Sequence, residues 1–335
     1  MLAKMTCSNQ AVFVLTSNGS DIYWAMTRIA IASLRLTNPG LRILVACDHV
    51  THRTLKSQEN QIISEVDEWR PFMTLEGSPV VRNRFLKTSL RGRLSGNFLF
   101  LDSDILVRGD LSTVFATQAD VAGAVNHSRS SLQGQIGAVD REVLDQLQWS
   151  LTRGFYINGG VLFYNDTRGA HEFGRCWHEL WLGAYRKLGK YRDQTALNYA
   201  LERSGARFHL LADRFNGQFW GNPSVVKDAL IWHFYLSSPN VPQTPFLIEA
   251  LHLIATGELR LDKISAMIRQ IHPWKSQHII DDWVANRLIQ KQHYDGWEGD
   301  SIRMGYSRAI LRTCSKPLDR FSQKLSWLGR ARNRQ

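Results

Sequence analysis

The sequence has no run of apolar residues long enough to cross a bilayer. A membrane-spanning helix needs about 20 mostly apolar residues in a row, whereas the apolar stretch near the start covers only residues 11–15. Residues 1–10 also lack the basic and then apolar layout of a signal peptide. These absences predict a cytoplasmic protein that is soluble or lies on the inner face of a membrane.

Cysteines are few and widely separated. The chain of 335 residues has 4 cysteines, and none of them stand at the short spacings that zinc sites and redox motifs require. A disulfide framework is not expected, because such frameworks belong to small, cysteine-dense secreted domains. We interpret the cysteines as free thiols, and none is a convincing nucleophile. They are Cys7, Cys47, Cys176 and Cys314.

Acidic residues are scarce only at the C-terminal end. The formal net charge is +11, and residues 301–335 contribute +8 of it through nine basic residues and one acid, Asp319. The rest of the chain is nearly neutral and has no nucleic-acid-binding motif, so a nucleic-acid partner is not expected. Apolar residues are interspersed with the arginines of the tail. This pattern fits an amphipathic segment on an anionic membrane surface, or equally a solvated or disordered extension.

Strand and helix patterns alternate and predict an α/β fold. Residues 11–15 form a buried strand, residues 22–36 a helix and residues 41–47 a second strand, an order typical of a right-handed βαβ unit. Residues 98–101 are large and apolar, as in a central strand buried on both faces. After about residue 239 the sequence becomes mainly helical. Further strands are predicted at residues 121–125 and 160–164, and further helices at residues 84–94, 172–188, 195–204 and after Pro245.

Two carboxylates, Asp102 and Asp104, directly follow the apolar strand. Open α/β sheets place their ligands at this end of a strand. Two carboxylates at this spacing can hold a hard divalent cation, which can neutralise a diphosphate. The pair alone is weak evidence, because a solvated turn has the same composition. An HAD-type phosphatase would use Asp102 as a nucleophile, but its aspartates normally close the first strand of the domain, and here about a hundred residues come first.

Three further segments place polar groups beside apolar ones. Asn158 and the paired glycines after it precede a buried strand, so the backbone there could lie close to a sugar; a tight turn is the alternative. Asp193 and Gln194 stand at the start of a predicted helix. They could bind a ligand there, or they could serve only as the N-cap and first turn of the helix. His233 is a single histidine among apolar neighbours, which is more often a buried structural residue than a ligand.

Taken in order, these segments resemble glycosyltransferase family 8, whose members are retaining enzymes with the GT-A fold. The likeness covers about residues 11–236 and consists of Leu-Asp-Ser-Asp, Asn-Gly-Gly-Val-Leu, Asp-Gln-x-x-Leu-Asn and His-Phe. It implies a mostly parallel central sheet flanked by helices, with a helical C-terminal extension. The implied regions are a GT-A nucleotide-sugar-binding catalytic domain (9–240), a helical region (241–300) and a basic amphipathic tail (301–335).

The resemblance also implies an activity and roles for single residues. The enzyme would move a hexose, expected from a UDP-sugar, with retention of anomeric configuration. Mn²⁺ or Mg²⁺ would be bound by Asp102, Asp104 and His233. Gln194 matches the residue beneath the anomeric carbon, and because an amide is a poor nucleophile we expect front-side substitution; Asp193 would orient the sugar. The donor-binding residues would be Thr16, Asn18, Asp21, Arg84, Lys87, Asp102, Ser103, Asp104, Asn158, Gly159 and Gly160.

The basic residues before the apolar strand leave an alternative open. Arg84 and Lys87 lie one helical turn apart and match positions that contact donor phosphate or sugar. Their charges could instead form a solvated face shared with Arg82, Arg91 and Arg93.

One departure from the family pattern leaves the function itself open. Family members commonly follow the histidine with Gly-x-x-Lys-Pro-Trp, whereas this chain reads His-Phe-Tyr-Leu-Ser-Ser-Pro. The lysine that contacts the diphosphate is missing, and Lys275 is only a candidate replacement. The alternative is therefore a non-catalytic relative that binds nucleotide sugars. The acceptor, expected to be a glycan, a glycolipid or another hydroxyl compound, is not specified by these residues.

Overall fold

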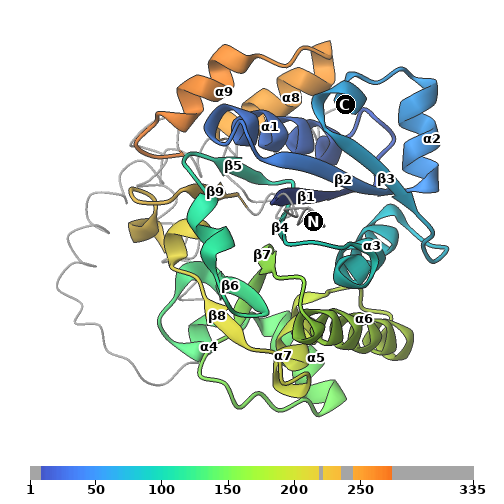
Figure 1. The fold of residues 1–335 in the computed structure, drawn as a ribbon, viewed down its shortest axis with the longest axis vertical. Helices are drawn as coiled ribbons and strands as arrows, with labels where there is room; N and C mark the ends of the chain where they lie inside the picture. Colours follow the sequence, from blue (N-terminus) through green and yellow to red (C-terminus); the bar gives the residue numbers. More distant parts are fainter. Residues whose placement is uncertain (1–8, 219–221, 235–243, 274–335) are drawn as a thin grey trace, which may run out of the picture. The chain divides into compact units, whose positions relative to one another are not determined.

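The computed structural model describes residues 9–218, 222–234 and 244–273, which form an α/β fold (Figure 1). The strands are β1 (Gln10–Leu15), β2 (Arg42–Asp48), β3 (Glu68–Phe72), β4 (Phe98–Leu101), β5 (Ile105–Val107), β6 (Val121–Val125), β7 (Ile157–Tyr164), β8 (Phe208–Leu210) and β9 (Ile231–His233). One seven-stranded sheet has the order β3-β2-β1-β4-β7-β6-β8, and β5 pairs with β9 in a second, two-stranded sheet.

Strand direction confirms the prediction of a mostly parallel sheet. β1 is parallel to β2 and β4, β2 is parallel to β3, and β6 is parallel to β8. β7 runs antiparallel to both of its neighbours, β4 and β6. Because of this reversal, the start of β7 lies at the same edge of the sheet as the end of β4. This edge is where the candidate site lies.

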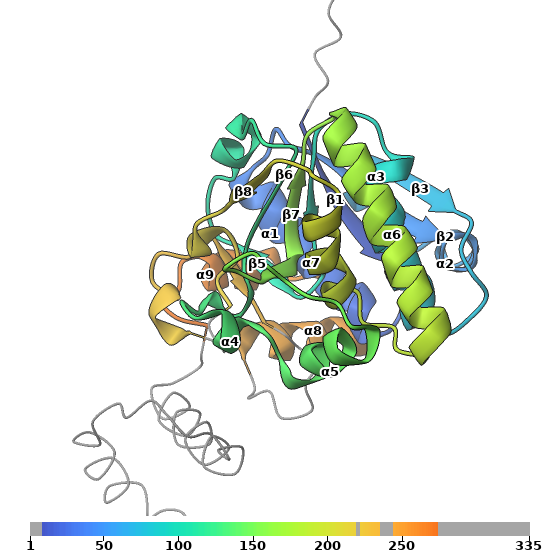
Figure 2. The ribbon, with the colours of Figure 1, turned by 90° about the horizontal axis from the view of Figure 1, so that it is seen from below.

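Helices cover both faces of the large sheet (Figures 1 and 2). The α-helices are α1 (Ile22–Thr37), α2 (His49–Ser57), α3 (Pro79–Arg93), α4 (Leu132–Gln135), α5 (Ala138–Leu147), α6 (Arg168–Leu188), α7 (Gln194–Arg203), α8 (Pro245–Thr256) and α9 (Leu261–Ile268). Short 3-10 helices are η1 (Gln61–Glu65), η2 (Ser112–Ala116), η3 (Asn126–Ser128), η4 (Asp213–Phe215) and η5 (Pro223–Val225). α3, α6 and α7 pack on one face, and α1 lies on the other with α8 and α9 against it.

The apolar runs of the sequence become the interior of the sheet. β1 and β4 are buried at every position, as expected for strands covered on both faces. α1 is buried from Trp24 through Leu34 without interruption, because it lies between the sheet on one side and α8 and α9 on the other. Uninterrupted burial explains why its apolar residues are spread around the helix instead of forming one stripe.

Three element boundaries differ by more than two residues from the sequence-based prediction, and one of them is the start of α6, which lies at Arg168 instead of residue 172. α3 begins at Pro79, several residues before the predicted start, because the Ser78 side chain accepts a hydrogen bond from the Val81 N–H and proline occupies the first turn. β7 begins at Ile157, three residues before the predicted start at residue 160, and therefore includes the whole Asn-Gly-Gly segment. The glycines are strand residues, not turn residues.

Several sequence-based predictions fall partly outside the described residues. The boundary expected near residue 240 and the tail at 301–335 both lie there, so the division into three regions stays a prediction. Cys47 and Cys176 are free thiols, and burial, with Asp48 adding to it, raises the pKa of Cys47 to about 12. Such a thiol is a poor nucleophile. Among the described residues, no helix combines the length and apolarity required of a membrane span.

His178 on α6 gives the fold a pH dependence. Its Nδ1 lies 2.8 Å from the Thr88 hydroxyl, and its ring meets Phe85 edge-on. Burial, aided by repulsion from Arg93, lowers its pKa from 6.5 to about 4. As the pH falls, His178 is therefore protonated in the unfolded chain before it is protonated in the folded protein. Acidification between pH 6.5 and 4 thus favours unfolding. Above pH 6.5 His178 does not lower the free energy of unfolding, and below pH 4 the lowering has reached its full value.

We expect His178→Gln to lose less stability than the parent on acidification across this window. The measurement is the free energy of urea unfolding of both proteins at several pH values between 7 and 4. Parallel profiles for the two proteins would contradict the assignment.

Candidate functional site

The reversed strand β7 brings the Asn-Gly-Gly segment beside the first aspartate. Leu101, the last residue of β4, pairs with Val161 of β7. One residue further on, the Asp102 N–H donates a hydrogen bond to the Gly160 carbonyl oxygen at 2.8 Å. The ladder thus places Asp102 next to Gly160 through backbone pairing alone.

The small β5–β9 sheet brings His233 to the two aspartates. Ile105 pairs with His233 in this ladder, and the Phe234 N–H donates to the Asp104 carbonyl oxygen at 2.9 Å. The imidazole Nε2 of His233 lies 3.3 Å from Asp104 Oδ1. One ligand atom each from Asp102, Asp104 and His233 falls within 4.8 Å of the others. The three residues that the sequence proposed as a cation site therefore lie together.

The cluster fits a divalent cation by its chemistry and its shape. Two carboxylates and one imidazole are a set that first-row divalent ions accept. Gly160 forms the floor of the cluster, because a Cβ there would lie 2.3 Å from His233 Cε1 and 2.9 Å from Asp102 Oδ2. The strand backbone thus approaches both side chains more closely than any residue with a side chain would allow.

Two cations of α3, Lys87 and Arg84, pair with carboxylates at the site. Lys87 Nζ lies 3.0 Å from Asp102 Oδ1 and 3.4 Å from Asp193 Oδ2. The Arg84 Nε lies 3.2 Å from Asp193 Oδ1. Burial opposes ionisation of Asp193, but Lys87 and Arg84 outweigh it, so the pKa of Asp193 is lowered and the group is charged. These pairs connect α3 with the end of β4 and the start of α7.

The solvated-face alternative for α3 is wrong. The Lys87 side chain is only 4% exposed, and Arg91 is fully buried, where it donates to the carbonyl oxygens of Leu94 and Gly96. Arg82 pairs with Asp48. The basic residues of this helix therefore have separate, specific partners.

Charge at the site favours an additional cation. The carboxylates of Asp102 and Asp193 pair with Lys87 and Arg84, and that of Asp104 lies beside His233. An excess of negative charge in a partly buried site repels a diphosphate. Counted over the described residues alone, three carboxylates against two cations therefore favour the binding of a further cation.

Gln194 is held against the start of β7. Its Oε1 accepts hydrogen bonds from Asn158 Nδ2 at 3.1 Å and from the Gly159 N–H at 3.4 Å. Gln194 is the first residue of α7, and Asp193 precedes it as the N-cap residue without a side-chain capping bond. The Asp193 carboxylate is thus turned toward Lys87 and Arg84 and not toward its own helix, which argues against the purely structural N-cap.

A chain of buried amides extends from this point to the histidine. Asn158 Nδ2 also donates to Asn126 Oδ1 at 3.2 Å. Asn216 Nδ2 donates to Asn158 Oδ1 at 3.0 Å, and Asn216 Oδ1 lies 2.8 Å from His233 Nδ1. Sequence reasoning missed Asn126 and Asn216, because neither stands in a motif; no pattern signals an asparagine whose partners come from distant segments.

The loop after β1 lies at the same edge of the sheet, since β1 and β4 are parallel neighbours. Asp21 caps α1 by accepting from the Trp24 N–H at 2.9 Å, and it also accepts from Ser17 and Asn18. The Thr16 hydroxyl donates to the Pro79 carbonyl oxygen at 2.9 Å. Ser103 accepts from the Thr27 hydroxyl at 2.8 Å. These contacts give each residue a structural role, and their contact with a donor stays a prediction.

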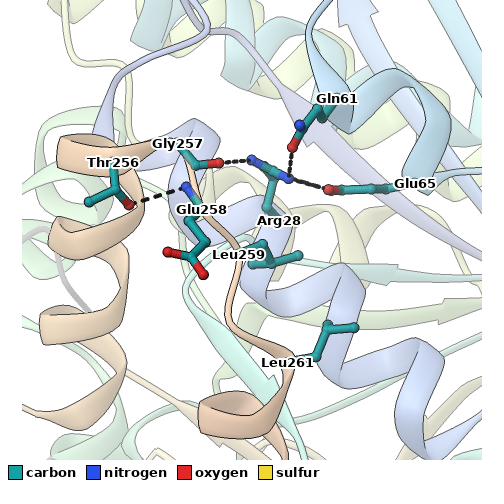
Figure 3. Close-up of a pocket in the computed structure, with 8 residues that line it drawn as sticks. All are labelled: Arg28, Gln61, Glu65, Thr256, Gly257, Glu258, Leu259 and Leu261. Carbon is teal, nitrogen blue, oxygen red and sulfur yellow. Dashed lines mark hydrogen bonds and ion pairs between the residues drawn. The ribbon is translucent and has the colours of Figure 1, made fainter.

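An open pocket lies elsewhere and shares no residue with the acidic cluster (Figure 3). Arg28 of α1 crosses it and donates to Gln61 Oε1 at 3.1 Å, to Glu65 Oε1 at 2.9 Å and to the Gly257 carbonyl oxygen at 3.4 Å. These hydrogen bonds of Arg28 join α1 to η1 and to the end of α8. We assign this pocket a structural role. Lys275, the candidate replacement for the missing lysine, lies outside the described residues.

Comparison with known proteins gives matches in structure only. No family model and no curated protein matches the chain. It is similar to the glycosyltransferase GlyE of Streptococcus pneumoniae TIGR4, with 18% identity, a TM-score of 0.48 and coverage of 81% of this chain and 66% of that one. It therefore spans slightly less than two thirds of that protein.

Two further solved structures are similar at comparable levels. The galactosyltransferase LgtC, in complex with donor and acceptor sugar analogues, has 15% identity, a TM-score of 0.48 and coverage of 74% of this chain and 95% of that one. Mouse xyloside xylosyltransferase 1 has 13% identity, a TM-score of 0.44 and coverage of 70% and 99%. At these identities the likeness concerns the fold, so we infer function from the site.

Proposed function

We propose that this chain is a retaining glycosyltransferase that moves a hexose from a UDP-sugar to a hydroxyl acceptor in a metal-dependent reaction. The observation that carries the proposal is the convergence of Asp102, Asp104 and His233 from separate segments. They lie beside Lys87 and the Asn-Gly-Gly segment, in the order that resembles glycosyltransferase family 8. A turn rich in aspartate would not bring a distant histidine into the same cluster.

The donor diphosphate would lie over the acidic cluster. Asp102, Asp104 and His233 would hold Mn²⁺ or Mg²⁺, which supplies the positive charge that stabilises a departing diphosphate. Lys87 keeps Asp102 in place through its 3.0 Å contact. Arg84, fixed by Asp193, contributes a second positive charge to the same surface. The loop of Thr16, Asn18 and Asp21 would contact the nucleotide.

The sugar would lie against the start of β7 and of α7. Because Gly159 and Gly160 have no side chains, Lys87 and the cluster of Asp102 and His233 lie close to this strand, and Asp193 would bind sugar hydroxyls. Gln194 Oε1 already accepts from two N–H donors, which lowers its ability to attack the anomeric carbon. The arrangement supports front-side substitution, in which the acceptor oxygen approaches from the face that the diphosphate leaves.

The acceptor and the place of action are inferred from the sequence. A glycan or glycolipid acceptor on the inner face of a membrane would suit the basic tail at 301–335, which carries nine basic residues and one acid. Each basic residue near an anionic surface contributes about 1 kcal/mol of attraction. We propose a cytoplasmic enzyme that meets such a surface through this tail.

The proposal predicts nucleotide release that depends on a sugar donor and on a divalent cation. Full-length protein is incubated with UDP-glucose, UDP-galactose or GDP-sugars, with Mn²⁺, Mg²⁺ or a chelator, and free nucleotide is measured. We expect release from a UDP-hexose with Mn²⁺ or Mg²⁺ and none with the chelator. Release that ignores the chelator, or no release from any donor, contradicts the enzymatic proposal.

The same experiment separates the enzyme from a relative that only binds. A protein that had lost turnover would bind UDP in the presence of Mn²⁺, as measured by calorimetry, and would release no nucleotide from any donor. Donor hydrolysis would exclude this alternative.

A further inference from the structure

We infer that Asn216 and Asn158 are positioning residues that set the tautomer of His233 and thereby direct its Nε2 toward a bound cation. The inference rests on the cation site of the proposed function and adds to it two residues that do not touch the cation. Asn216 lies directly after η4, and its segment is tied to β9, because the His233 N–H donates to the Gly217 carbonyl oxygen at 3.1 Å. The backbone therefore holds Asn216 beside the histidine.

The direction of the amide chain follows from backbone groups that cannot be reversed. The Gly160 N–H lies 2.8 Å from one terminal atom of Asn158, and since an N–H only donates, that atom is the oxygen. The group of Asn216 that lies 3.0 Å from this oxygen must then be its NH₂. Its own oxygen consequently faces His233 Nδ1 at 2.8 Å. An oxygen there requires a proton on Nδ1.

Asn126, at the far end of this chain of amides, independently fixes the same orientation. Asn126 donates from Nδ2 to the Gln135 carbonyl oxygen, so its Oδ1 is the atom that faces Asn158, 3.2 Å from Asn158 Nδ2. That contact again requires the NH₂ of Asn158 on this side and its oxygen on the other. Two backbone groups, an N–H and a carbonyl, thus agree on the orientation of every amide between them.

The orientation of Asn216 determines which nitrogen of His233 can bind a metal. With its proton on Nδ1, a neutral imidazole has its lone pair on Nε2, the atom that lies 3.3 Å from Asp104 Oδ1 within the cluster. Histidines that bind metals almost always donate their other N–H to an oxygen, which fixes both the tautomer and the ring orientation. Asn216 supplies that oxygen here as a neutral amide, so it adds no negative charge to a site that already has an excess.

The hydrogen bonds between these amides and the histidine are shielded from water. Asn216 is fully buried, and Asn158 and His233 are 4% and 3% exposed, so water is a poor substitute for any of these partners. Asn158 also donates to Gln194 Oε1 at 3.1 Å. The Asn158 amide is therefore connected through Asn216 to the histidine and directly to the glutamine of the proposed sugar site.

The test compares Mn²⁺ affinity between two matched variants of the full chain. Asn216→Leu removes the oxygen that faces His233. Asn165→Leu removes another asparagine whose Nδ2 donates to two carbonyl oxygens, those of Thr117 and Ala119, away from the cluster. Free Mn²⁺ is measured by electron paramagnetic resonance at increasing metal concentration, and melting temperatures report on folding. We expect the Mn²⁺ dissociation constant to rise roughly 10- to 100-fold in Asn216→Leu and to stay at the parent value in Asn165→Leu. A folded Asn216→Leu protein with parental Mn²⁺ affinity would overturn the inference.

A spectroscopic measurement on the parent protein decides the matter if Asn216→Leu does not fold. Protein labelled with ¹⁵N-histidine is loaded with Zn²⁺ as the diamagnetic probe, and His233 is identified by the signals lost in His233→Gln. We expect a protonated Nδ1 and a metal-bound Nε2. A protonated Nε2, or metal on Nδ1, refutes the inference.

Failure of this inference and failure of the proposed function give different results. A parent protein that binds Mn²⁺ through an Nδ1-protonated His233, yet releases no nucleotide from any sugar donor, supports the inference and removes the proposed activity. A parent protein that binds neither Mn²⁺ nor Zn²⁺ removes the inference together with the metal dependence.

Discussion

Asp104→Asn is expected to reduce metal-dependent nucleotide release roughly 100- to 1,000-fold, a loss typical of removing one group that stabilises developing charge. The carboxamide keeps the size of the side chain but removes its charge. Asp104 faces His233 Nε2 at 3.3 Å, so the change acts on the cation cluster itself. We expect weaker Mn²⁺ binding and a lower turnover number, with little change in melting temperature.

A matched substitution shows whether the effect belongs to the site. Asp145→Asn changes the same residue type on the exposed side of α5, and its activity should equal that of the parent. The proposed function loses its central assignment if Asp104→Asn retains parental turnover at every Mn²⁺ concentration tested.

Gly160→Ala is expected to damage both the cation cluster and the stability of the fold. The added methyl group would lie 2.3 Å from His233 Cε1 and 2.9 Å from both Asn158 Oδ1 and Asp102 Oδ2. None of these side chains can move away alone, because each is hydrogen-bonded or paired with another residue. Overpacking of this kind costs about 1–3 kcal/mol of stability, and displacing reactive groups by about 1 Å can cost roughly 100-fold in rate.

The control for this substitution is Gly183→Ala on α6. A Cβ at Gly183 meets nothing within 4 Å, and alanine is the better helix former by about 1 kcal/mol, so the variant should be at least as stable as the parent. Melting temperature, Mn²⁺ affinity and nucleotide release are measured for both variants. Equal activity and Mn²⁺ affinity in Gly160→Ala and the parent would disprove the close contact that we describe.

Much of the site could be predicted from sequence because its parts lie next to strongly patterned segments. The apolar run at 98–101 predicts β4, and Asp102 follows it directly. The sequence also predicts the helix of Lys87, although its predicted start lies five residues after the observed one. Local hydrophobic pattern and the strand-end rule for ligands in α/β sheets place these residues in the fold, whereas their roles are assigned through the resemblance to glycosyltransferase family 8.

The tertiary pairing that positions His233 could not be predicted from local pattern, and His233 is named as a ligand only through the resemblance to glycosyltransferase family 8. β5 and β9 have only three residues each, too few for a periodic pattern, so the pairing that brings His233 to Asp104 is invisible in the sequence. The role of Asn216 depends on that pairing in turn. Asp21 shows a different difficulty, because an aspartate that caps a helix has the same sequence signature as one that binds a ligand.

The β5–β9 pairing also has a consequence for the order of assembly. It joins segments that are distant along the chain, and distant contacts form late because more chain must be brought to order before they contribute. β1, β2 and β4 find their partners earlier in the sequence. On the ribosome, a nascent chain therefore carries Asp102 and Asp104 before His233 has been synthesised. Under the proposed function, tight cation binding requires a chain that extends at least to residue 233.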